Sequence, residues 1–463
     1  MQLLFDAITG KTEASSSADA PEEAASKDES EPTRPAKKRG SHRSRIKGLD
    51  QLPVETEEVI PDLVAADPDA FERIGEEVSE QLDFIPAKVI RRITVRPKFR
   101  RKAQRNLPPI VAPAPVTPLL GGLPSAALLA FMLVSKYIDH LPLYRQEQIF
   151  LRAGVGIPRD LIIHWIHKAI SLIDPVVQAI RREALASDYI QVDETTARYL
   201  SPGAGKAPLG HLWVVNVPGG SLFYHWGVGR GTEQLVETIG EKYVGTIQCD
   251  AYSVYTCYQK QQPADNLSLM ACLAHIRRNF HEVIEAGPHP QAALILLLIG
   301  NLYQIETRLR ETKAGPALRE AARAAQSAMI YRRIGKIMNV MLRHHRPQTP
   351  MGKALVYGIG NWERLGAYLA DGRIEIDNNL AENAIRTIKL GHKNWLFFGS
   401  KDAGHAAASI YTLVENCRRY GLPVEAYLKQ LLQTLPGLSD EAVIATLTPA
   451  RIADARRRKS RVA

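Results

Sequence analysis

Residues 376–400 combine a carboxylate with basic side chains at helical spacing. Arg386 and Lys389 follow Glu382 at spacings of four and seven, and residues so spaced share one face of a helix. One carboxylate flanked by two cations is suited to holding a metal ion beside a phosphate. The alternative is a solvated helix face with an ordinary ion pair, which contributes little to stability. The rest of the chain favours the metal site.

Two aspartates occupy positions where a carboxylate is costly. Asp193 lies inside the apolar segment YIQVDET, and Asp250 closes the segment VGTIQCDAY. A buried carboxylate needs a partner or a metal ion. Two aspartates and a glutamate can hold two divalent ions roughly 3.5 to 4 Å apart, which activate a water or 3′-hydroxyl and stabilise the leaving oxygen. Either aspartate alone could be a turn or cap residue, but with Glu382 they predict phosphodiester chemistry.

The segment that carries both aspartates has the pattern of a mixed α/β fold. DYIQVDETTARYL, GHLWVVNV and SLFYHWGVG predict an antiparallel meander. A short helix around TEQLVETIG, a strand VGTIQCDAYSVY, and a strand running into a helix in SLMACLAHIRRNFHEVIEAG follow. This order predicts a ribonuclease H-like catalytic domain over residues 188–432. A helical insertion over about 290–370 separates the sheet from Glu382.

The first hundred residues are polar and basic. Residues 1–48 form a tail poor in large apolar side chains, predicted to be disordered, and it ends in a basic arm that either binds phosphates or only aids solubility. Residues 49–106 alternate apolar and basic residues, which predicts a small basic β module. A proline-rich spacer then marks a domain boundary.

Residues 107–187 predict a helical, helix-turn-helix-like DNA-binding domain. Its second helix would present Arg159 and Lys168 to a DNA groove. An ordinary helical hairpin fits the same pattern. Residues 433–463 are expected to form a C-terminal helical segment that ends in a basic tail.

Composition favours a polyanionic partner. Lysine and arginine total 59 against 49 acidic residues, which gives a net charge of +10 and a pI near 9.3. The four cysteines include no Cys-x-x-Cys pair, so neither a zinc ribbon nor a disulfide framework is indicated, and a reducing cytoplasm fits best. No signal peptide is evident. The apolar window 119–134 falls short of the roughly 20 residues of a membrane span, so we expect no membrane association.

The segments YIQVDET, QCDAY, ACLAHIRRNF and EIDNNLAENAIRTIKLGHKNWLFFGS resemble, in this order, the insertion sequence 66 family of DDE transposases. The resemblance covers roughly residues 107–432. It implies a ribonuclease H-like core with a helical insertion, cleavage and joining of DNA strands at element ends, and two Mg²⁺ ions, with Mn²⁺ as a substitute. Asp193, Asp250 and Glu382 match the catalytic, metal-binding triad. Lys389 resembles a lysine placed against terminal phosphates.

The resemblance also implies partners and further site residues. The partners are double-stranded DNA of the element ends and target, a second or further copy of the chain, and small accessory proteins of the same element. Cys272 and His275 match a Cys-x-x-His motif whose role is structural or metal binding. The family's polar frame around the glutamate matches Asn378, Asn379, Arg386, Lys393 and Asn394, and all of these except Asn378 are expected to contact DNA.

Two departures from the family pattern keep other functions open. Residues 55–105 contain no cysteine, so no zinc is expected in the β module, and the leucine-rich coil common at the N-terminus of the family is missing. A catalytically silent DNA-binding protein derived from a transposase is therefore the first alternative. A nuclease acting on special DNA structures or on RNA–DNA hybrids is the second.

Overall fold

The computed structural model describes residues 89–90, 97–99, 110–111, 116–119, 123–203, 205–263 and 266–462. The tail and basic arm predicted over 1–48, and most of the β module predicted over 49–106, lie outside the described residues. Among the described residues before 123, β1 (Lys98–Phe99) pairs antiparallel with β2 (Ile110–Val111).

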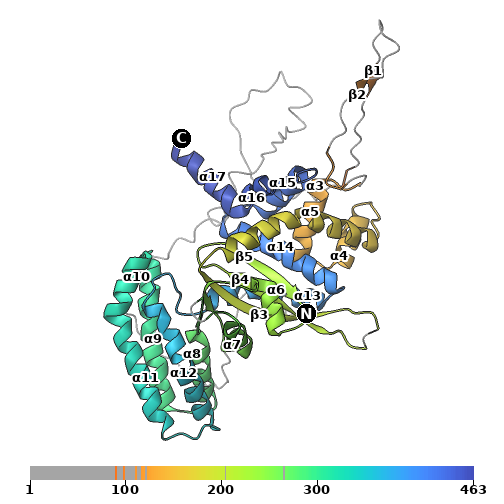
Figure 1. Ribbon diagram of the computed structural model, residues 1–463. Helices are drawn as coiled ribbons and strands as arrows, with labels where there is room; N and C mark the ends of the chain where they lie inside the picture. Colours follow the sequence, from red (N-terminus) through yellow and green to blue (C-terminus); the bar gives the residue numbers. More distant parts are fainter. Residues whose placement is uncertain are drawn as a thin grey trace, which may run out of the picture. The chain divides into compact units, whose positions relative to one another are not determined.

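A mixed sheet carries the two predicted aspartates (Figure 1). Its strand order is β5-β4-β3-β6-β7, with β8 pairing to the far end of β3. The first three strands form the predicted antiparallel meander, which is confirmed, whereas β6, β7 and β8 add parallel pairs. The strands are β3 (Tyr189–Tyr199), β4 (Leu209–Asn216), β5 (Leu222–Gly227), β6 (Gly245–Gln248), β7 (Leu267–Met270) and β8 (Phe397–Phe398).

The strand predicted over VGTIQCDAYSVY is shorter than expected. β6 ends at Gln248, and α7 (Ser253–Lys260) begins within the predicted strand. The Asp250 carboxylate accepts the backbone N–H of Tyr252 at 3.0 Å, a local turn that competes with strand pairing. The flanking helices α6 (Thr232–Ile239) and α8 (Leu273–Glu285) lie where the sequence predicted them.

Three helices precede the sheet: α3 (Ala126–Tyr137), α4 (Leu143–Arg152) and α5 (Arg159–Leu185). α4 and α5 are joined by a short turn, as the helix-turn-helix outline predicted. The buried face of α5 continues to Ile180 and packs against β5 and α14 (Lys401–Arg419). These helices share one hydrophobic core with the sheet. The boundary predicted at residue 187 therefore falls inside a continuous core.

The section predicted as an insertion is helical and packs with α8 around a second core (Figure 1). α9 and α12 contact α8, and α11 contacts both α9 and α12. The elements are α9 (Pro290–Glu311), α10 (Pro316–Ala322), η4 (Arg323–Ser327), α11 (Ala328–Leu342), α12 (Pro350–Leu365) and η5 (Gly366–Leu369).

Among the described residues, α9 is the helix long and apolar enough to cross a membrane. Its Ile295, Ile299 and Leu302 are fully buried in the second core. Its Glu306 is also fully buried and forms ion pairs with arginines of the following helices. This is the packing of a core helix in a globular protein.

The chain then returns to the sheet through α13 (Asn379–Trp395), the helix predicted around Glu382. Leu396 ends α13 with a left-handed backbone (φ 62°) and turns the chain into β8. The remaining helices, α14, α15 (Val424–Thr434), α16 (Glu441–Thr446) and α17 (Pro449–Val462), follow in order.

Candidate active site

Three parallel strands are paired at one level of the sheet. Gln191 of β3 pairs with Gln248 of β6, which pairs in turn with Met270 of β7. Asp193 and Asp250 each lie two residues beyond the paired glutamine of their strand. β6 stops at Gln248, whereas β3 continues and meets β8 only at Arg198. The two aspartates therefore lie at the same level, where β6 leaves the edge of β3.

Asp193 is a half-buried carboxylate surrounded by other acids. Its Oδ1 accepts the backbone N–H of Glu194 at 2.8 Å. Burial, together with the negative charges of Glu194, Glu382 and Asp250, raises the pKa of Asp193 to about 7, although the hydrogen bond from Glu194 N–H acts in the opposite direction. Repulsion of this kind is relieved by a bound cation.

Glu194, next in the strand, has its own partners. Its side chain accepts hydrogen bonds from Arg230 Nε at 2.7 Å and from the Tyr255 hydroxyl at 3.2 Å. Arg230 also stacks on the ring of Tyr252. Glu194 is therefore neutralised within the protein, which leaves Asp193 as the β3 carboxylate with no cationic hydrogen-bond donor among the described residues.

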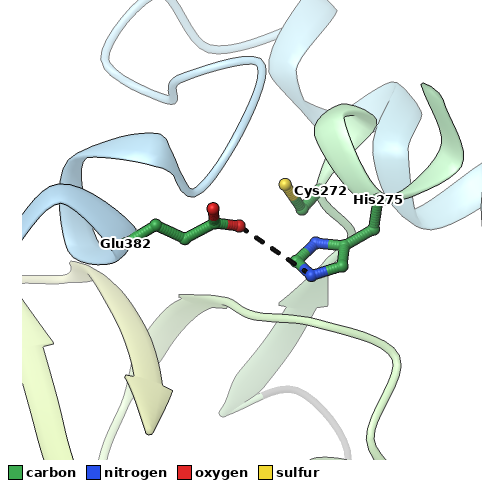
Figure 2. A group of neighbouring side chains, drawn as sticks. All are labelled: Cys272, His275 and Glu382. Atoms are coloured by element: carbon green, nitrogen blue, oxygen red, sulfur yellow. Dashed lines mark ion pairs between the residues drawn. The ribbon is translucent and has the colours of Figure 1, made fainter. Parts of the chain in front are cut away.

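Glu382 lies in the first turn of α13 and points toward α8 (Figure 2). Its Oε1 is 3.8 Å from His275 Nε2, and its Oε2 is 3.8 Å from a guanidinium nitrogen of Arg278. These distances exceed those of hydrogen bonds. Oε1 is buried and has no hydrogen-bond partner among the described residues. An orphaned carboxylate oxygen is a potential metal ligand.

Cys272, His275 and Glu382 offer ligand atoms within 4.8 Å of one another (Figure 2). Among the described residues, no cluster of potential metal ligands this tight includes Asp193 or Asp250. Burial raises the pKa of the Cys272 thiol to about 12, so the free thiol stays protonated. Its Sγ accepts the backbone N–H of Asn378 at 3.2 Å. Without an ion, Cys272 therefore joins the starts of α8 and α13.

The three acids predicted from the sequence as metal ligands fit a hard divalent ion better than zinc. Asp193, Asp250 and Glu382 contribute only oxygen atoms, which Mg²⁺ and Mn²⁺ prefer. A bound cation would lower the pKa of Asp193, which burial and neighbouring acids raise. It would also give the buried Oε1 of Glu382 a partner. Glu382 is the residue common to both groups.

The 375–378 segment, which leads into α13, is hydrogen-bonded to the strands that carry the aspartates. Gln191 Nε2 donates to the carbonyl of Asp377 at 3.0 Å, and Gln248 Nε2 donates to the carbonyl of Glu375 at 2.9 Å. Asn378 Nδ2 donates to the carbonyl of Val192 at 3.3 Å. The buried side chain of Asn378, part of the polar frame that the resemblance implies, therefore anchors α13 to β3.

Sequence reasoning missed the two glutamines, although a signal was present. Each stands two residues before an aspartate, in QVD and in QCD. Both side chains are fully buried. The same amide side chain two residues before each aspartate indicates that both glutamines have one structural partner. That partner is the 375–378 segment.

The basic residues predicted on α13 form an exposed stripe that leads away from Glu382. Arg386, Lys389 and Lys393 are exposed and share the helix face of Glu382. Asn394 is exposed near the end of this helix. Asn379, also exposed, donates through Nδ2 to the Asp377 carboxylate at 2.7 Å and therefore holds the 375–378 segment.

Arg159 and Lys168 are exposed on α5. Arg159 lies 3.9 Å from the Glu147 carboxylate of α4. α5 packs chiefly against α14 and β5. Both residues therefore lie on a helix that packs at the β5 side of the sheet, and the order β5-β4-β3-β6 separates that side from β6.

The aromatic run after α13 joins the main core. Trp395 stacks on Phe398 with ring centroids 4.6 Å apart, and Phe398 meets the edge of Trp226 at 5.1 Å. Phe397 remains exposed. Trp395 and Phe398 therefore belong to an aromatic core cluster behind the helix.

Comparisons with known proteins agree with the resemblance found in the sequence. The model described as "Transposase IS66 family" matches residues 121–406, more than half of the chain. The chain is 32% identical over 413 residues to the uncharacterized protein y4qI of Sinorhizobium fredii, covering 86% of this chain and 74% of the relative. It is 30% identical over 380 residues to the uncharacterized protein y4jD of the same organism, covering 79% and 73%.

Proposed function

Because the chain belongs to the IS66 family of transposases, we propose that it cuts and joins DNA strands at the ends of an insertion sequence. The observation that carries this proposal is the matched position of Asp193 and Asp250 beyond paired strands, with Glu382 on the helix tied to those strands. The charges of Glu382 and Asp250 both contribute to the raised pKa of Asp193.

We also propose that the sheet and its flanking helices are a ribonuclease H-like catalytic core. The support is the order of elements: a three-stranded meander, α6, β6, α7, β7 and α8, with α13 returning to β3 and β4 after the insertion. This arrangement brings acids far apart in the sequence to one sheet edge.

The carboxylates of Asp193, Asp250 and Glu382 would hold Mg²⁺. When bound, the metal lowers the pKa of an attacking water or 3′-hydroxyl and stabilises the negative charge on the leaving oxygen. The protein's contribution is to orient the carboxylates. Two of them are fixed by hydrogen bonds that they accept, Asp193 from the backbone N–H of Glu194 and Asp250 from the backbone N–H of Tyr252.

The exposed stripe on α13 would bind the DNA backbone beside these acids. Arg386, Lys389 and Lys393 carry positive charge outward from Glu382 along one helix face. Cations of this kind attract phosphates and release counterions, without reading sequence. The stripe would thereby hold a scissile phosphate next to the carboxylates.

The test is cleavage and strand transfer by the purified full chain on duplexes that carry the element ends. Wild-type protein should cut in Mg²⁺, and Asp193→Ala should lose cleavage by several orders of magnitude while retaining DNA binding. Retained cleavage in Asp193→Ala would contradict the assignment of the triad.

Two other outcomes identify the alternatives. Binding of element ends without cleavage in either Mg²⁺ or Mn²⁺ identifies a silent DNA-binding protein. Cleavage confined to RNA–DNA hybrids identifies a nuclease of different specificity.

A further inference from the structure

The helical insertion is ionically bonded to the segment that leads into α13. Arg310 of α9 donates through Nη2 to Glu375 Oε2 at 2.7 Å, and Arg319 of α10 donates through Nη1 to Glu375 Oε1 at 2.8 Å. Both carboxylate oxygens of Glu375 are therefore held by arginines of the insertion. The Arg310 side chain is 45% exposed, whereas that of Arg319 is 13% exposed.

Arg319 is itself fixed inside the insertion. Its Nη2 donates to Glu306 Oε2 at 3.1 Å, and Arg323 donates to both oxygens of the same glutamate at 2.7 and 2.8 Å. Arg323 Nη1 also donates to the carbonyls of Tyr368 and Asp371. Glu306 and Arg323 are fully buried. A buried network with these bonds made holds its members in one geometry.

The backbone of Glu375 faces the sheet. Its N–H donates to the Tyr189 hydroxyl at 3.0 Å, and its carbonyl accepts from Gln248 at 2.9 Å. The Tyr189 hydroxyl in turn donates to Gln248 Oε1 at 2.6 Å. Glu375 therefore connects the insertion to β3 and β6, the strands that carry Asp193 and Asp250.

Stability alone is a weak explanation for this network. Burying ionised groups costs desolvation energy that their attraction often only offsets. Burial would raise the pKa of Glu375, but the hydrogen bonds from Arg319 and Arg310 outweigh it and lower the pKa below its ordinary value. The carboxylate is therefore charged at neutral pH and keeps both arginines. What the network provides beyond apolar packing is a fixed position for the 375–378 segment.

We propose that Arg310 and Arg319 are positioning residues through which the helical insertion sets the place of Glu382. The two arginines hold Glu375 and thereby fix the 375–378 segment. α13 begins where this segment ends. The consequence for catalysis rests on the proposed function, whereas the mechanical coupling does not. Loss of either arginine leaves the sheet and the insertion folded but loosens the start of α13.

Hydrogen exchange measured by mass spectrometry on the full chain tests the coupling without any catalytic assay. In Arg310→Gln, amides of residues 375–383 should exchange about tenfold faster, because one charge-assisted hydrogen bond is lost. Arg310→Lys should restore part of the protection. Arg308→Gln is the matched control, since Arg308 is exposed on the same helix and makes no side-chain hydrogen bond among the described residues. Equal exchange in Arg310→Gln and Arg308→Gln would overturn the proposal.

A double-mutant cycle guards against general destabilisation. Glu375→Gln and Arg310→Gln should be strongly non-additive in the exchange of residues 375–383, because they break one interaction. Faster exchange spread evenly over α9 and α11 would overturn the proposal, since it indicates loosening of the whole insertion.

The catalytic consequence is measured separately. Arg310→Gln should raise the Mg²⁺ concentration for half-maximal cleavage several-fold, with a DNA affinity equal to that of Arg308→Gln. Altered exchange with an unchanged Mg²⁺ dependence would contradict the role of the network in placing Glu382. A wild-type protein that never cleaves would instead refute the proposed function, while the exchange result still decides the coupling.

Discussion

Asp193 is a carboxylate placed where neutral side chains are preferred. It lies half-buried on β3, and burial together with Glu194, Glu382 and Asp250 raises its pKa to about 7. Folding of the metal-free protein is therefore opposed by the ionisation of this residue at neutral pH. A bound divalent cation would reverse the effect.

This shift predicts a pH-dependent effect of Asp193→Asn on stability. The folded pKa of about 7 exceeds the ordinary value of 3.8, so the stabilising contribution of the protonated form is complete below pH 3.8 and is lost as the pH rises through 7. In EDTA, the Tm advantage of Asp193→Asn should grow between these values and level off above. The difference in free energy of unfolding between Asp193→Asn and the wild type should change by at most about 1.4 kcal/mol per pH unit. Thermal unfolding across this range measures it, and a pH-independent difference would contradict the environment described for Asp193.

Lys389 on the exposed stripe of α13 should act through its charge. Lys389→Gln should weaken binding to element ends several-fold and lower the slope of log affinity against log salt by about 1. Lys429→Gln on α15 is a control of equal charge change at an exposed position. Salt titrations of DNA binding compare the two variants, and identical slopes would remove Lys389 from the DNA interface.

At the scale of elements, the 375–378 segment shows what sequence can and cannot predict. The spacing of Glu382, Arg386 and Lys389 predicted α13, and the meander and the helix α8 followed from local patterns. The bonds from Gln191 and Gln248 to Asp377 and Glu375 join residues far apart in the chain. No local propensity encodes such pairs. The strand predicted through Asp250 was too long for the opposite reason. There a local hydrogen bond, from the backbone N–H of Tyr252 to the Asp250 side chain, outweighed an apolar pattern.

The packing of α14 against β5 depends on Gly404. A Cβ at this position would lie 2.3 Å from the ring of Trp226, which is buried. Gly404→Ala should therefore destabilise the protein by about 1 to 3 kcal/mol, despite the better helix propensity of alanine. Gly399→Ala, where an added Cβ meets nothing within 4 Å, is the control. Thermal or denaturant unfolding measures both, and equal stability of the two variants would contradict this packing.

At the scale of the whole molecule, the described chain has two hydrophobic cores with Glu382 between them. The first core unites the helices before the sheet, the sheet and α14, and the second unites α8 with the insertion. The sequence predicted separate helical and catalytic segments, because turns and composition mark the boundaries of elements. It could not predict that α5 shares the core of the sheet, since that depends on which faces meet.

Family membership and geometry together lead to one central claim, that Asp193, Asp250 and Glu382 bind divalent metal as a unit. The most direct measurement is anomalous diffraction from crystals of the protein, bound to an element-end duplex, in Mn²⁺. If the three acids bind metal together, manganese density should lie between the carboxylates of Asp193 and Asp250, with Glu382 turned toward it. This density should be lost in Asp193→Asn. Density only at Cys272, His275 and Glu382, or none at saturating Mn²⁺, would contradict the central claim.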